Sequence, residues 1–143
     1  MFTKYYGEYE IGETWVSKGR TVTETDIVMF SALSGDWYPL HTDIEYAKNT
    51  PFQQRIAHGM LVLSISTGLL NMESGIVAAF YGIDELRFVK PTFIQDTIKV
   101  KLEIVDMREK AQAGVIKAKQ TIMNQHEKAV VESFVSVLIN KQF

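Results

Sequence analysis

An apolar segment at residues 58–72 limits the folds that are open to this chain. Its large apolar side chains point to nearly every side of a helical wheel, which is the pattern of a helix buried on all faces. The apolar run at its centre, residues 60–70, is interrupted by Ser, Thr and Gly and is too short to span a bilayer of about 30 Å. The rest of the chain is therefore expected to wrap around this helix.

The pattern of the sequence changes to period two after Ala78. At 98–104 Ile, Val and Leu alternate with Lys and Glu, and similar alternation returns at 116–122, which predicts antiparallel strands with one face toward water. Further strands are expected near 14–22, 80–89 and 130–139. A buried helix followed by such a meander predicts an α+β domain in which a sheet of about five strands curls around the helix.

Length and composition are those of one globular domain, expected to span residues 1–143. The net charge is -2 and the basic residues are scattered, so nucleic acid is not expected as a ligand. The chain has no Cys and only 3 His, which excludes disulfides and thiolate metal sites, and no metal site is expected. No secretion signal is visible, so the protein is expected in the cytoplasm, without membrane contact.

The run Ser34-Gly35-Asp36-Trp37-Tyr38-Pro39-Leu40-His41 places a carboxylate and an imidazole five residues apart. Pro39 stiffens this segment, because its ring fixes the backbone φ angle. Two proton-transfer groups on one rigid turn suggest an enzyme that works by general acid/base catalysis. Asp36 and His41 are the candidate catalytic groups. Which of them acts as base stays open, because the two groups would titrate together.

Two helix-start patterns flank this segment. Thr23-Glu24-Thr25-Asp26 resembles a capping box and predicts a short helix that Gly35 ends. Thr42-Asp43-Ile44-Glu45 predicts a second capped helix that ends before Pro51. His41 is therefore expected on a loop, just outside the start of that second helix.

A second motif, Arg55-Ile56-Ala57-His58-Gly59-Met60, opens the apolar helix. The first N–H groups of a helix have no partner within it, so the N–H of Gly59 is a candidate donor to a developing oxyanion. Tyr38, His58 and Met60 are predicted to contact a substrate beside these groups. For His58, a structural role in packing or in capping the helix start is favoured over contact with a substrate.

The segment 23–70, with Gly35-Asp36-x-x-Pro39-Leu40-His41 and Ala57-His58-Gly59, resembles the MaoC-like dehydratase or R-specific enoyl-CoA hydratase family. Members of this family have the hot-dog fold. The later Arg87-Phe88-Val89-Lys90-Pro91, followed by Asp96-Thr97, is similar to the strand and turn after the family's central helix. The likeness therefore covers most of the chain.

The resemblance implies a hydratase that adds water reversibly across a trans-2-enoyl-CoA thioester to give a 3-hydroxyacyl-CoA. Asp36 and His41 take the positions of the catalytic dyad, the Gly59 N–H is the oxyanion donor, and no metal or redox cofactor is implied. The resemblance also implies a homodimer, able to assemble further, with the acyl-CoA in a tunnel near the subunit boundary. An exposed edge strand in such a sheet also favours a homodimer.

Two positions depart from the family. Tyr38 stands where Asn is usual and cannot supply the paired donor and acceptor of an amide, and Gln95 stands where the turn commonly has Gly. Two other functions stay open. One is a hot-dog acyl-CoA thioesterase, in which the same helix start polarises the thioester for hydrolysis. The other is a non-catalytic acyl-CoA-binding or partner subunit, which the change at Tyr38 suggests.

Overall fold

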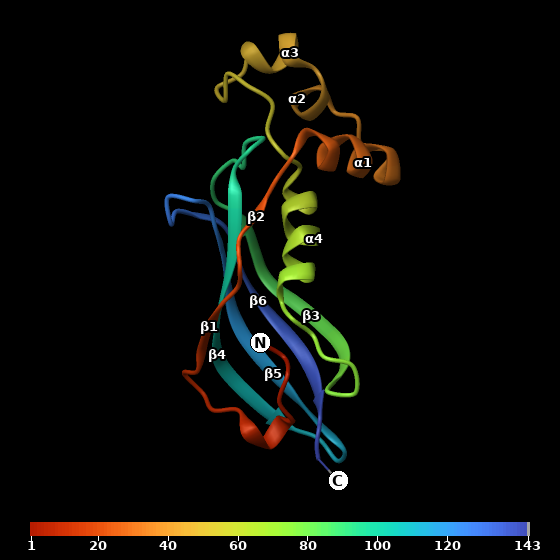
Figure 1. Ribbon diagram of the computed structural model, residues 1–143, viewed down its shortest axis with the longest axis vertical. Coiled ribbons are helices and arrows are strands. Elements are labelled where there is room, and N and C mark those ends of the chain that lie inside the picture. The colour runs from red at the N-terminus through yellow and green to blue at the C-terminus, as the bar shows by residue number, and fades with distance from the viewer. Residues whose placement is uncertain (143) are drawn as a thin grey trace.

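The computed structural model describes residues 1–142, and Phe143, the last residue of the expected domain, lies outside the described residues. Six strands form one antiparallel sheet in the order β1-β4-β5-β6-β3, with β2 paired to β4 (Figure 1). The strands are β1 Thr14–Val16, β2 Arg20–Thr21, β3 Val77–Phe88, β4 Thr97–Glu109, β5 Ala113–Met123 and β6 Ala129–Asn140. The helices are η1 Tyr6–Glu8, α1 Glu24–Ser34, α2 Pro39–Thr42, α3 Ile44–Lys48 and α4 Gly59–Leu69.

The strand alternation that the sequence predicts is present in β4. Its inward residues have at most 1% of their surface exposed, whereas Lys99, Lys101 and Glu103 on the other face are exposed. The inward residues join one core with α4 and with the inner faces of β5 and β6. The expected α+β architecture is therefore confirmed, with Ile98, Val100, Leu102 and Ile104 forming its best-buried row.

Helix α4 is less buried than the sequence predicts. Leu61, Val62 and Leu69 are buried, but the side chain of Met60 is 53% exposed. Ser64, one turn further along the helix, is also exposed. The expectation of burial on all faces is wrong because the sheet covers only one side of the helix (Figure 1). Among the described residues, no helix has the length and apolar character needed to cross a membrane.

The single strand expected near 14–22 is two short strands, which brings the count to six. The backbone N–H of Ser17 donates to the carbonyl of Val100 at 2.8 Å, and the Ser17 hydroxyl accepts from the N–H of Val100 at 2.8 Å. The hydroxyl thus takes the place of a backbone carbonyl, and the regular ladder stops there. At Gly19, a Cβ atom would lie 3.0 Å from the methyl group of Thr97, so the chain passes close to β4.

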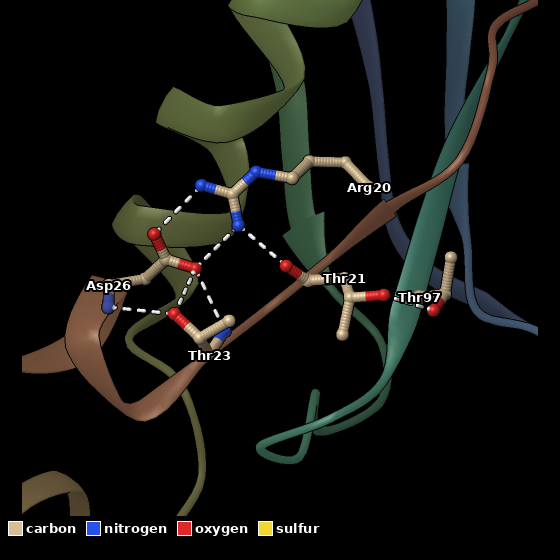
Figure 2. A network of polar contacts seen from close by, with 5 residues as sticks. All are labelled: Arg20, Thr21, Thr23, Asp26 and Thr97. Atoms are coloured by element: carbon tan, nitrogen blue, oxygen red, sulfur yellow. Dashed lines mark hydrogen bonds and ion pairs between the residues drawn. The ribbon is translucent and has the colours of Figure 1, made fainter.

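Helix α1 begins at the capping box that the sequence predicts. The Asp26 N–H donates to the Thr23 hydroxyl at 3.2 Å, and the Thr23 N–H donates to the Asp26 carboxylate at 2.8 Å. Arg20 holds the same carboxylate with two N–H groups at 2.5 and 2.7 Å, as Figure 2 shows. Gly35 ends the helix at φ 76°, in the left-handed region that favours glycine. This helix leads the chain from the sheet to the residues that follow Gly35.

The predicted capping box at Thr42 is wrong, and His41 does not lie on a loop. His41 belongs to the single turn of α2, with Pro39 at its first position. Thr42 is the last residue of α2, and its hydroxyl points back to donate to the carbonyls of Trp37 and Tyr38, so it belongs to this turn and not to the start of the next helix. The carboxylate of Asp43 caps α3 instead. Helices α1, α2 and α3 together form a group at one end of the sheet, near the start of α4 (Figure 1).

Candidate active site

The start of α4 forms one wall of a cavity of about 370 Å³. His41 and Gly59, two of the predicted site residues, line it, and Lys90 contributes a positive charge. The remaining wall is mostly apolar and comes from the segment before α4, from the end of β3 and from the start of β6. Its members include Phe52, Ile56, Val62, Phe88, Val130 and Val131. The cavity therefore suits an apolar ligand that brings a reactive group to His41 and Gly59.

His41 is held with one ring nitrogen bonded and the other available. Its Nδ1 lies 2.8 Å from the main-chain oxygen of Ile56. A carbonyl oxygen only accepts, so Nδ1 carries the proton and Nε2 keeps its lone pair in the neutral ring. Burial lowers the pKa of His41 below its usual 6.5, and His58 adds to this, while the Ile56 carbonyl and Asp36 oppose it. Near neutral pH, His41 is therefore an uncharged base.

Asp36 follows the left-handed turn at Gly35 and is exposed. One carboxylate oxygen accepts from the Tyr38 N–H at 3.1 Å, which leaves the carboxylate with further acceptor capacity. Polar side-chain atoms of Asp36, His41 and His58 all lie within 4.8 Å of one another. One water molecule making two hydrogen bonds of usual length spans about 4.6 Å. The structure therefore brings the two predicted acid/base groups within reach of a single water.

Gly59 is the first residue of α4, where the helix leaves its N–H groups without partners. A Cβ atom at this position would lie 2.7 Å from two ring carbons of Phe88, which comes from β3. Only glycine allows the ring to approach so closely. The Gly59 N–H is therefore at a helix start, in the wall of the cavity, beside an aromatic cover.

The three predicted substrate contacts lie elsewhere. The Tyr38 hydroxyl is 3.2 Å from that of Tyr46, and the Tyr38 ring meets His41 only edge-on, at a centroid distance of 6.1 Å. Met60 lies on the open side of α4, and His58 is buried at 3% exposure. None of the three lines the cavity, so their contact with substrate stays a prediction.

Sequence reasoning missed several groups that shape the site. The carbonyl of Ile56 fixes the His41 tautomer, and the ring of Phe88 covers Gly59. A main-chain carbonyl carries no sequence signal, and Phe88 reads only as one member of a strand. Lys90 and Pro91 were visible as the end of a strand, but the sequence did not place them beside His41.

A family model described as the MaoC like domain matches residues 8–125. The chain belongs to the MaoC-like family. It is 40% identical over 103 residues to Protein MaoC of Klebsiella aerogenes, with 71% of this chain aligned, but it spans only 30% of that longer protein. It is 28% identical over 139 residues to the (R)-specific enoyl-CoA hydratase of Rhodospirillum rubrum, covering 97% of this MaoC-like chain and 94% of the relative.

A solved structure agrees closely with this MaoC-like chain. The X-ray structure titled as a monoamine oxidase regulatory protein from Archaeoglobus superposes with a TM-score of 0.91 at 41% identity, covering 98% of this chain and 96% of the other. The curved antiparallel sheet packed on a central helix is the hot-dog fold that the motifs led us to expect.

Proposed function

We propose that this protein adds water reversibly across the double bond of a trans-2-enoyl-CoA thioester to give a 3-hydroxyacyl-CoA. The observation that carries the proposal is the spacing of Asp36 and His41, within reach of one water, with His41 in the cavity wall that also holds the free helix start at Gly59. Asp36 is not among the residues that line this cavity. The name of the Rhodospirillum rubrum relative, an (R)-specific enoyl-CoA hydratase, supports the same reaction class.

Because His41 is uncharged and its Nε2 has a free lone pair, we propose that this one group takes up and returns the proton in the reaction. In the hydration direction His41 Nε2 takes a proton from the water, and the oxygen forms a bond to C3 of the enoyl group. The same proton then passes from Nε2 to C2, so both parts of the water enter the product and His41 is regenerated. The Asp36 carboxylate accepts a hydrogen bond from the second hydrogen of the water, which stays on the oxygen, and stabilises the imidazolium while it exists. Dehydration runs through the same steps in reverse.

The Gly59 N–H is proposed as the donor to the thioester oxygen. Negative charge gathers on this oxygen when the hydroxyl adds to C3, and an N–H at a helix start is aimed outward and stabilises it. One such donor contributes about 10² to 10³ in rate. The apolar cavity would hold the acyl chain, and Lys90 offers a positive charge for a phosphate of CoA.

The proposed reaction needs neither a metal nor a redox cofactor. Asp36, His41 and His58 do hold ligand-type atoms within 4.8 Å of one another. The His41 and His58 rings are stacked, however, with centroids 3.9 Å apart and planes 29° from parallel. Their lone pairs lie in the ring planes and run side by side instead of meeting at one ion. Dialysis against a chelator is therefore expected to leave hydratase activity unchanged.

We further propose a homodimer joined through β3. This strand is at the edge of the sheet and carries large apolar side chains that are at least 37% exposed, namely Phe80, Tyr81, Ile83 and Phe88. An edge strand offers unpaired backbone N–H and C=O groups to a second strand, and a second copy of the chain supplies one of matching shape. Sedimentation is expected to give twice the 16.3 kDa mass of the chain. A stable monomer at micromolar concentration would contradict this.

The hydration assay follows loss of the conjugated enoyl absorbance when purified protein is added to crotonyl-CoA and to longer or branched enoyl-CoA esters. Turnover with at least one ester is expected. A parallel assay with a thiol reagent detects free CoA, which a thioesterase would release and a hydratase would not. Release of thiol without hydration of the conjugated double bond, or no turnover with any ester, would overturn the proposed function.

A further inference from the structure

We infer that His58 is a positioning residue that holds both members of the acid/base pair in place, an inference that rests on the proposed function. The His58 side chain contacts Asp36 through a hydrogen bond and His41 through its ring face. Its side chain is buried at 3% exposure and its Nε2 is within hydrogen-bond distance of Asp36 and Ser31, so it acts on the reaction through its neighbours and not on the substrate.

The first contact fixes the backbone that carries the carboxylate. His58 Nε2 lies 3.0 Å from the main-chain oxygen of Asp36 and 3.3 Å from the hydroxyl of Ser31. A carbonyl oxygen only accepts, so Nε2 carries the ring proton and donates it to Asp36, with Ser31 as a second acceptor. Asp36 is otherwise exposed, with few bonds of its own, and this donor ties it to the start of α4.

The second contact fixes the imidazole. The His58 ring lies between two others, stacked on His41 at 3.9 Å and meeting the ring of Phe30 edge-on at 4.9 Å. One face of His41 is thereby covered, and its Nδ1 is bonded to Ile56. The ring of His41 then has little freedom to turn, and its Nε2 keeps one direction.

Two purely structural roles for His58, capping of α4 and simple packing, fit the structure less well. The residue precedes α4, but its side chain makes no capping bond to the helix. Simple packing would be served better by an apolar ring, because the Nδ1 atom of His58 is buried and has no partner among the described residues. A buried nitrogen without a partner is a cost that is explained if the opposite nitrogen has a required task.

A matched pair of amide substitutions isolates that task. In His58→Gln the amide nitrogen reaches about as far as Nε2 and can still donate to the carbonyl of Asp36. In His58→Asn the amide nitrogen stops near the position of Nδ1 and cannot. We expect kcat to fall about 10²-fold in the Asn variant, with KM within threefold of wild type, because a displaced catalytic group costs rate and not binding. The Gln variant is expected to recover at least a tenth of the wild-type kcat.

A third variant and a control complete the kinetic test. His58→Phe keeps the ring stack and loses the donor, so its kcat is expected to lie between that of the Asn variant, which loses both contacts, and that of wild type. His126→Gln, in an exposed turn far from the site in sequence, is expected to behave as wild type. Equal loss of kcat in the Gln and Asn variants, in proportion to a fall in melting temperature, would show a merely structural role. Wild-type kcat in His58→Asn would also overturn the inference.

Two measurements on the protein without substrate separate this inference from the proposed function. Amide exchange at Tyr38, whose N–H is bonded to the Asp36 carboxylate, is expected to be faster in His58→Asn than in His58→Gln. An NMR titration is expected to show the His41 pKa nearer 6.5 in the Gln and Asn variants, which lose the covering ring, than in His58→Phe. Unchanged exchange and titration would overturn the positioning role. Absence of turnover in the wild type would overturn the function alone.

Discussion

Helix α1 has an aspartate at each end. Asp26, at its start, is held by both terminal nitrogens of Arg20 and by the backbone and hydroxyl of Thr23 (Figure 2). Asp36, just past its end, is exposed, and its carboxylate accepts from the Tyr38 N–H. Arg20 is the main reason that the pKa of Asp26 falls to about 2.

The two aspartates have different roles: Asp26 stabilises the fold, whereas Asp36 belongs to the candidate site. The oxygens of Asp26 are taken up by fixed donors, so its charge supports the helix and is not available for proton transfer. The Asp36 carboxylate keeps acceptor capacity and has a buried imidazole beside it. The same residue type thus anchors α1 at one end and serves the candidate site at the other.

The largest expected effect is that of removing the charge of Asp36. Asp36→Asn keeps the size of the side chain but cannot stabilise an imidazolium at His41, so we expect hydratase kcat to fall by 10² to 10⁴. The melting temperature should stay within about 2 °C of wild type, because this carboxylate makes few contacts. Enoyl absorbance assays and thermal melts measure the two effects. A large loss of stability in Asp36→Asn would show that Asp36, like Asp26, has a structural role.

The pH profile is the next test. The hydration direction requires His41 with a free Nε2, and burial lowers its pKa below 6.5. A lowered pKa keeps the ring uncharged to more acidic pH, so kcat/KM at pH 6.5 is expected to exceed half of its maximum. It should then fall about tenfold per pH unit below the His41 pKa. If kcat/KM already declines as the pH falls from 7.5, the decline is caused by the titration of a group other than His41.

Asp26→Asn is expected to act on stability instead of rate. Loss of the charged capping interaction should lower the free energy of unfolding by about 1 to 2 kcal/mol, measured by urea denaturation, with kcat within threefold of wild type. A depressed pKa gives stability that is complete above the unfolded value near 3.9. The gap between wild type and variant should therefore narrow as pH falls from about 4 toward 2. If the difference in the free energy of unfolding persists at pH 2, it is caused by packing and not by the charge of Asp26.

The smallest effect is expected at Tyr38. Its hydroxyl bonds that of Tyr46 and touches neither Asp36 nor His41. In Tyr38→Phe we therefore expect kcat to stay within twofold and stability to change by less than about 1 kcal/mol, because the bond is exposed. A tenfold loss of kcat would mean that the phenol joins the acid/base pair when substrate is bound.

Much of the fold follows from local sequence patterns. The alternation at 98–104 and the Thr23 capping box depend on neighbours in the chain, and both are present. The split at Ser17 depends on a hydroxyl that replaces a carbonyl in the ladder with Val100, which alternation does not encode. The choice of Asp43 over Thr42 as a helix cap depends on where α2 ends, because α2 includes Thr42 and leaves Asp43 as the residue that precedes α3.

The site divides in the same way. Asp36 and His41 lie on one short segment, so their proximity could be predicted. The approach of Phe88 to Gly59 joins β3 with the start of α4 and depends on the folded packing. Gln95 is an intermediate case, because its φ of 77° lies in the left-handed region that favours glycine, which fits the Gly that the family resemblance implies there, although this chain has a side chain.

Strand β3 is bent at several places along its length. Its pairing with β6 shifts register three times, and Glu85, within the last shift, has a φ of 52°. A straight, flat edge would act as a template for any extended peptide and would invite aggregation. A kinked edge accepts few partners, and another copy with the same kinks is the one best suited to match it. The register shifts of β3 thus protect this apolar edge strand from pairing with unrelated extended segments.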